Sequence, residues 1–159
     1  MGRQSVTRTR FARILASGFG AGFFPFAPGT AGSLVALGLG AAMLHVSVTL
    51  LVVASLLVCA GGIWAVREAE AETDDPGWMV IDEFAGQWIA MLGMETLGWK
   101  SLLAAFLLFR LFDIFKPRPI AWADQRKDAL GVMADDMIAG TMAALVLTVL
   151  NWRLPGLLD

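Results

Sequence analysis

The chain has 159 residues, of which 57% are hydrophobic and 16% charged, with a formal net charge of −2 at pH 7. Soluble domains are about one-quarter charged, so this composition excludes an ordinary soluble protein and predicts an integral-membrane domain over residues 1–159. A single cysteine excludes a disulfide framework and a cysteine-based zinc site. The chain also lacks a basic tract, and we expect no nucleic-acid partner.

The N-terminal half predicts one short helix at the membrane interface and two membrane helices. The start, MGRQSVTRTRFAR, is basic, and we expect it to be the interfacial helix. Residues 33–66 carry no charge except at His45 and are too many for one span of about 20 residues. The patch HVSVT at 45–49 therefore predicts a break between a short or re-entrant helix over 33–44 and a full helix over 48–66. The preceding PGTAGS, residues 28–33, is predicted to be a turn.

Three further apolar segments complete a predicted all-α, multi-pass transmembrane bundle. They cover residues 80–97, 102–115 and 132–150, and the linkers at 67–77, 97–100 and 116–131 hold most of the charge. Lysine and arginine gather in the N-terminus and in the 116–131 linker, which predicts that both lie in the cytoplasm. This topology brings four polar features to the cytoplasmic face, namely PGTAGS, Asp82 with Glu83, Arg110 with Asp113, and Asp135 with Asp136.

Two of these features begin membrane segments with the same pattern, D-x-x-A-G, at Asp82 and at Asp136. Asp82 shares a helix face with Gly86, Ala90 and Gly93, and small residues of this kind let a second helix approach closely. Carboxylates are costly in hydrocarbon, so these acids are expected to face the bundle interior.

The converging carboxylates predict a magnesium site. All-oxygen ligands suit this ion, and we expect Asp82, Glu83, Asp135 and Asp136 to hold it. We expect catalytic roles for Asp82, Asp136 and Asp113, the last either holding metal or orienting a water. The predicted phosphate-binding residues are Arg110 and Lys116, assisted by Thr30 and Ser33 of the PGTAGS turn. These parts suit metal-assisted phosphoryl chemistry on an anionic lipid headgroup, by water attack or through a phospho-aspartate.

Each motif alone has a plainer interpretation. Arg110 and Asp113 can form a structural ion pair, Asp82 and Asp136 can cap helices, and PGTAGS can be only a turn. A small ion or anion transporter and a non-catalytic assembly subunit are the competing functions. Among phosphatases, the residues exclude the C-x5-R cysteine type, the two-histidine type and the D-x-D type, because none of these patterns occurs.

Four blocks together resemble the phosphatidylglycerophosphatase A family. They are PGTAGS at 28–33, DDPGWMVIDEFAGQW at 74–88, RLFDIFKPRPI at 110–120 and GVMADDMIAG at 131–140, in the family's order. The resemblance implies a magnesium-requiring enzyme of the bacterial inner membrane, with its active site toward the cytoplasm. It also implies the substrate, phosphatidylglycerophosphate, which is converted to phosphatidylglycerol and phosphate.

Overall fold

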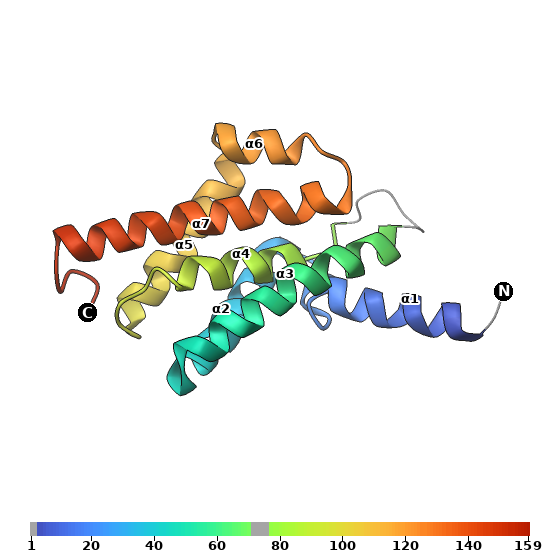
Figure 1. Cartoon of the computed structure of the whole chain (residues 1–159), viewed down its shortest axis with the longest axis horizontal. Helices are drawn as coiled ribbons and strands as arrows, with labels where there is room; N and C mark the ends of the chain where they lie inside the picture. Colours follow the sequence, from blue (N-terminus) through green and yellow to red (C-terminus); the bar gives the residue numbers. More distant parts are fainter. Residues whose placement is uncertain (1–2, 71–76) are drawn as a thin grey trace.

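The computed structural model describes residues 3–70 and 77–159, which form seven α-helices and one 3-10 helix, with no strand among them (Figure 1). The predicted all-α class is confirmed. The elements, in chain order, are α1 (Arg3–Ala16), η1 (Ala21–Phe23), α2 (Pro28–Val46), α3 (Val48–Glu70), α4 (Ile81–Met91), α5 (Trp99–Phe115), α6 (Arg118–Asp124) and α7 (Ala129–Arg153).

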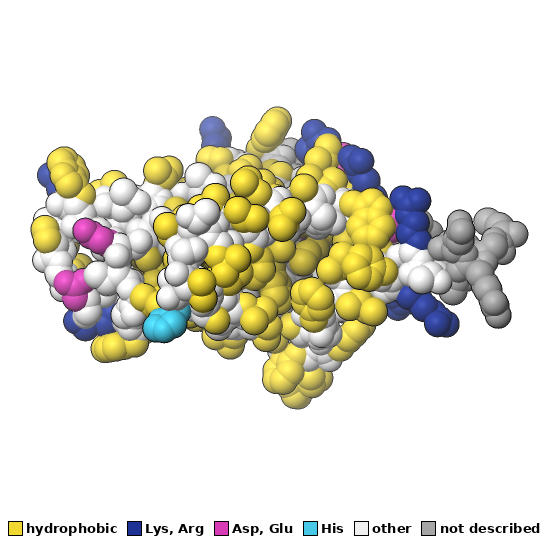
Figure 2. Space-filling view, turned by 60° about the horizontal axis from the view of Figure 1, so that its bottom comes forward, with side chains coloured by type: hydrophobic (Ala, Val, Ile, Leu, Met, Phe, Trp, Pro, Cys, Tyr) yellow, Lys and Arg dark blue, Asp and Glu magenta, His cyan; other side chains and the backbone are white. Residues whose placement is uncertain are grey.

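Three of these helices, α2, α3 and α7, are long and apolar enough to cross a membrane. With 11 residues, α4 is too short to span about 30 Å of hydrocarbon, and α5 has 17 residues, the lower limit for a span. Figure 2 shows hydrophobic side chains over the middle of the molecule, with lysine and arginine mostly toward its two ends. An apolar middle suits the hydrocarbon core of a bilayer, and charged ends suit the water on its two sides. Together with the three long apolar helices, this distribution identifies the chain as a membrane protein.

The predicted break between the first two membrane helices is confirmed at Ser47, whose backbone is extended and whose hydroxyl accepts a hydrogen bond from the Leu50 N–H at 3.1 Å. The prediction that PGTAGS forms a turn is wrong, because α2 already begins at Pro28 rather than at residue 33. Proline suits the first helical position, where its missing N–H leaves no hydrogen bond unmade. Ser33 is therefore a helical residue, and its hydroxyl donates to the Gly29 carbonyl at 2.9 Å.

The remaining boundaries differ from the prediction mainly around α4 and α6. The helix predicted to reach residue 97 ends at Met91, where tight i→i+3 hydrogen bonds close the last turn before Gly93. The predicted linker 116–131 contains α6, which begins beside Pro119. Proline is tolerated in a first turn, so it starts this helix instead of preventing it. Most of the predicted acidic linker, residues 71–76, lies outside the described residues.

The short helix α4 is the centre of the bundle and packs against α7, α2, α3 and α5, with α7 the largest of these interfaces. It runs beside α7 with both starts at the same end (Figure 1). The two D-x-x-A-G patterns meet at their crossing: a Cβ placed on Gly140 would lie 2.2 Å from the Gly86 carbonyl oxygen. Only glycine permits this approach, and it brings the two acidic helix starts together.

Helix α1 is the most polar element and lies along the end of α3. Arg8 forms an ion pair with Glu68 at 2.8 Å, and its guanidinium lies 5.8 Å from the centre of the Trp64 ring. The last residue of α1, Ala16, accepts a hydrogen bond at 2.8 Å from the Val80 N–H, directly before α4. This contact fixes where α4 begins, and with it the position of the first acidic pair.

Candidate active site

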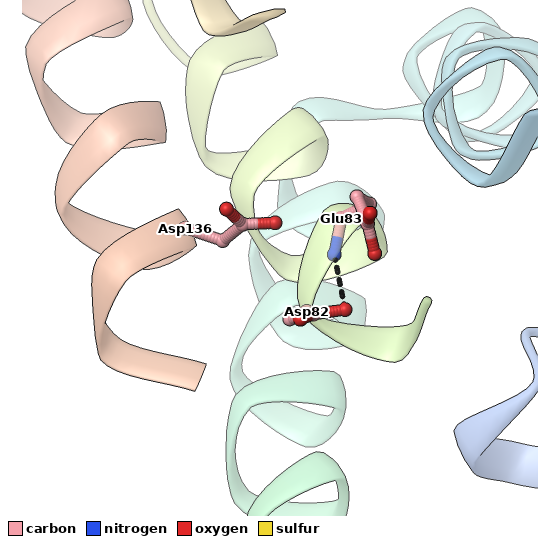
Figure 3. A group of neighbouring side chains, drawn as sticks. All are labelled: Asp82, Glu83 and Asp136. Atoms are coloured by element: carbon pink, nitrogen blue, oxygen red, sulfur yellow. Dashed lines mark hydrogen bonds between the residues drawn. The ribbon is translucent and has the colours of Figure 1, made fainter. Parts of the chain in front are cut away.

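Three carboxylates converge at the crossing of α4 and α7 (Figure 3). Asp82 and Glu83 lie in the first turn of α4, and Asp136 lies in the second turn of α7. One oxygen from each lies within 4.8 Å of the others. The Asp82 carboxylate is turned back toward its own helix, where it accepts the Glu83 N–H at 3.0 Å. Three oxygen ligands at this spacing could hold one cation, and they are three of the four predicted metal ligands.

The fourth predicted ligand, Asp135, binds a lysine instead. Its carboxylate accepts a hydrogen bond from the Lys116 ammonium at 2.7 Å and another from the Asp136 N–H at 3.0 Å. Asp135 is only 7% exposed, so the ammonium compensates a carboxylate that has lost most of its water. Asp135 nevertheless lines the same pocket as the other three acids.

Arg110 joins α5 to α2 and α4. Its Nη1 lies 2.7 Å from Asp113, 3.4 Å from the Ser33 hydroxyl and 3.9 Å from Glu83. The approach of Glu83 to α2 requires a glycine, because a Cβ on Gly29 would lie 2.1 Å from the Glu83 Oε1. Buried polar atoms need partners, yet Glu83 Oε2 and Arg110 Nε make no hydrogen bond in the described part of the chain. These two atoms remain available to a ligand or to water.

Helix α5 ends directly before Lys116, as predicted from Pro117, which follows this lysine. Lys116 is the C-cap residue, with a left-handed φ of 43°, and its ammonium bridges Asp135 to Asp124 of α6 at 2.5 Å. Partial burial lowers the pKa of Lys116, but the two carboxylates outweigh this and raise the pKa overall. The same contact lowers the pKa of Asp124. The pair thus stays charged and ties the segment between α5 and α7 to the site.

A pocket of about 530 Å³ opens over these residues. Its charged lining residues are Asp82, Glu83, Asp113, Lys116, Asp124, Arg126, Lys127, Asp135 and Asp136. Of the predicted phosphate-binding residues, Lys116 lines it. Arg110, Ser33 and the half-buried Thr30 are not among its lining residues.

The sequence analysis missed Asp124, Arg126 and Lys127 as residues of the site. All three lie in the charged stretch 116–131, which reads as a solvated linker. One signal was present: Ile120 and Ala123 lie three apart, which is the spacing of one apolar helix face, and both are buried. A short helix with this buried face turns the following charged residues back toward α7.

The fold and the pocket define a helical membrane protein with a pocket lined largely by carboxylates. The family model described as Phosphatidylglycerophosphatase A matches residues 14–151. The chain belongs to this family, and it is a phosphatase that acts on phospholipid.

Relatives support the assignment over nearly the full length. The chain is 34% identical to the phosphatidylglycerophosphatase A of Escherichia coli, covering 89% of this chain and 84% of the relative. It is 36% identical to the Haemophilus influenzae protein of the same name, covering 87% and 88%. It is also 39% identical to a Bacteroides thetaiotaomicron protein provisionally named phosphatidylinositol-3-phosphatase, covering 87% and 92%. No solved structure matches the chain.

Proposed function

We propose that this enzyme hydrolyses phosphatidylglycerophosphate to phosphatidylglycerol and inorganic phosphate, with magnesium, at the cytoplasmic face of the bacterial inner membrane. The observation that carries the proposal is the group formed by Asp82, Glu83 and Asp136 in the lining of a polar pocket. The family and two of the relatives named above support the substrate. The transport alternative requires acids near the middle of the bilayer, whereas these acids lie in the first two turns of their helices.

The three carboxylates fit a magnesium ion. They offer only oxygen atoms, and the buried Glu83 Oε2 has no hydrogen-bond partner among the described residues. Bound there, magnesium would supply a Lewis acid toward the phosphoryl oxygens. Asp82 and Asp136 are assigned with Glu83 to holding it. Asp136 is buried and Asp82 and Glu83 are half-buried, which limits the access of bulk water to the same oxygens.

The chain's other residues position the phosphate and the water. Lys116 borders the pocket and is assigned to the non-bridging oxygens of the phosphomonoester. Arg110 holds Asp113 at 2.7 Å, so that Asp113 can accept a proton from a water as its oxygen bonds to phosphorus. The bond between phosphorus and the headgroup oxygen breaks in the same displacement, and that oxygen leaves as the alkoxide and takes a proton from solvent.

The proposed orientation rests on charge. Arg8, Arg10 and Arg13 of α1 lie on the same side of the bundle as the start of α4, to which α1 is joined through Val80. Arg126 and Lys127 border the pocket itself. Positively charged loops stay in the cytoplasm, which supports the proposed cytoplasmic position of the pocket.

The test is phosphate release from phosphatidylglycerophosphate in mixed micelles, with and without magnesium, for the wild type, Asp136→Asn and Glu95→Gln. Glu95 is an exposed acid between α4 and α5, at the opposite end of α4 from the site. We expect Asp136→Asn to lose activity about 100-fold or more and to bind magnesium more weakly by calorimetry, while Glu95→Gln matches the wild type. Full magnesium-dependent turnover by Asp136→Asn would refute the site assignment.

A further inference from the structure

We propose that Lys127, at the turn between α6 and α7, forms a second anion site that binds the phosphodiester of the lipid substrate. The inference rests on the proposed function and deepens it: the preferred lipid carries a phosphodiester between its diacylglycerol and the phosphomonoester that is cleaved. Lys127 would then select such lipids over those with a single phosphate.

The lining of the pocket is divided by charge. Five of its six carboxylates lie on α4, α5 and α7, whereas its three cations, Lys116, Arg126 and Lys127, all lie in the segment between α5 and α7, together with the sixth carboxylate, Asp124. An anion with two phosphates fits this division. The phosphomonoester goes to the carboxylates and Lys116, where a metal ion would compensate the negative charge, and the phosphodiester lies against Lys127.

Two of the three cations already have carboxylate partners. Lys116 bridges Asp124 and Asp135, and Arg126 holds Asp128 through two hydrogen bonds, at 2.8 Å and 3.2 Å. Lys127 is exposed and makes no ion pair within 4 Å among the described residues. Its interaction with the Asp124 carboxylate is electrostatic and acts over a longer distance. Of the three pocket cations, Lys127 is therefore the one that can bind an anion without breaking an ion pair with a carboxylate.

The position of Lys127 suits the diester rather than the monoester. Trp122, five residues before it on α6, is 70% exposed, as is typical of tryptophan at the level of lipid headgroups. Ile120 on the same helix is fully buried and anchors α6 against α7. The turn that follows α6 thus lies at the headgroup level, where the phosphodiester is held by its attachment to the acyl-bearing glycerol. The pocket volume of about 530 Å³ is in the usual range for one bound ligand.

The experiment compares two lipids of equal acyl chains in the same mixed micelles, phosphatidylglycerophosphate and phosphatidic acid, which lacks the diester. Phosphate release gives kcat/KM for each lipid, and the ratio of the two values measures the preference. We expect Lys127→Gln to lower this ratio about tenfold, mainly through KM for phosphatidylglycerophosphate, and Lys127→Arg to keep it. The matched control is Lys100→Gln, since Lys100 lies in the first turn of α5, about 24 Å along that helix from Lys116.

The possible outcomes are distinct. If the wild type is active and Lys127→Gln has the same ratio of kcat/KM values, the second anion site is overturned and the proposed function stands. A wild type that releases phosphate from neither lipid would overturn the proposed function and this inference together. A lower ratio in Lys127→Gln, with Lys100→Gln unchanged, would support both.

Discussion

Substituting Gly140 with alanine tests how the acidic helix starts are held together. The added Cβ would lie 2.2 Å from the Gly86 carbonyl oxygen and 2.9 Å from its carbonyl carbon, and backbone atoms cannot rotate away as a side chain can. Restoring an ordinary contact, from 2.2 Å to 3.4 Å, separates α4 from α7 by about 1.2 Å. Overpacking of this kind costs about 1–3 kcal/mol. A misplacement of about 1 Å in a site that positions reacting groups costs about 100-fold in rate.

The assay follows two quantities in one detergent, the thermal unfolding midpoint and magnesium-dependent phosphate release. Gly61→Ala is the matched control: Gly61 also lies inside a helix, α3, but a Cβ there meets nothing within 4 Å. We expect the control to keep its activity and to gain up to about 1 kcal/mol from better helix propensity. Gly140→Ala should lose both stability and activity. If it unfolds at the wild-type temperature with full activity, the close crossing does not position the carboxylates.

Three further outcomes follow from single contacts, each measured by thermal unfolding. Trp88→Phe removes the buried hydrogen bond at 2.8 Å from the indole N–H to the Ala36 carbonyl and should cost about 1–3 kcal/mol, whereas an unchanged midpoint would show that α2 does not depend on it. The bonds from Arg126 and from the α7 backbone lower the pKa of Asp128 from its ordinary 3.8 to about 2, so its stabilisation is complete above about pH 4 and is lost as the pH falls toward 2. Asp128→Asn should therefore flatten the acid dependence across that window, and an unaltered pH profile would contradict the pairing. Lys116→Met leaves two carboxylates without their cation and should lower the midpoint and the phosphate release together, while loss of only one would separate its structural role from its binding role.

Much of the fold follows from patterns that act locally. The long apolar stretches predict α2, α3 and α7, and the polar patch around Ser47 predicts the break between the first two helices. The repeated D-x-x-A-G pattern predicts a close contact as well as a pair of acids, because small residues are useful only where a second helix touches them. For this reason the meeting of Asp82, Glu83 and Asp136 could be anticipated from the sequence.

Other features depend on contacts between distant residues and were missed. Helix α4 could not be delimited, because the apolar stretch continues past Met91 and the turn depends on Gly93 lying against Ala144 of α7. The partner of Lys116 could not be foreseen either, since Asp124 reaches it only after α6 has folded back. Among acids of one type, the sequence cannot distinguish a proposed ligand such as Asp136 from a counterion of Lys116 such as Asp135, its neighbour.

The shortness of α4 determines when the enzyme becomes functional during its synthesis. Eleven residues extend about 16 Å, so α4 cannot enter the bilayer as an independent span, and nearly all of its residues are buried by other helices. Its largest interface is with α7, which is synthesised almost forty residues later. Two of the three converging carboxylates therefore lie on a helix that meets the third carboxylate only after α7 has inserted. Assembly of the active site is thus a late event, completed by tertiary docking inside the membrane and not by the insertion of individual segments.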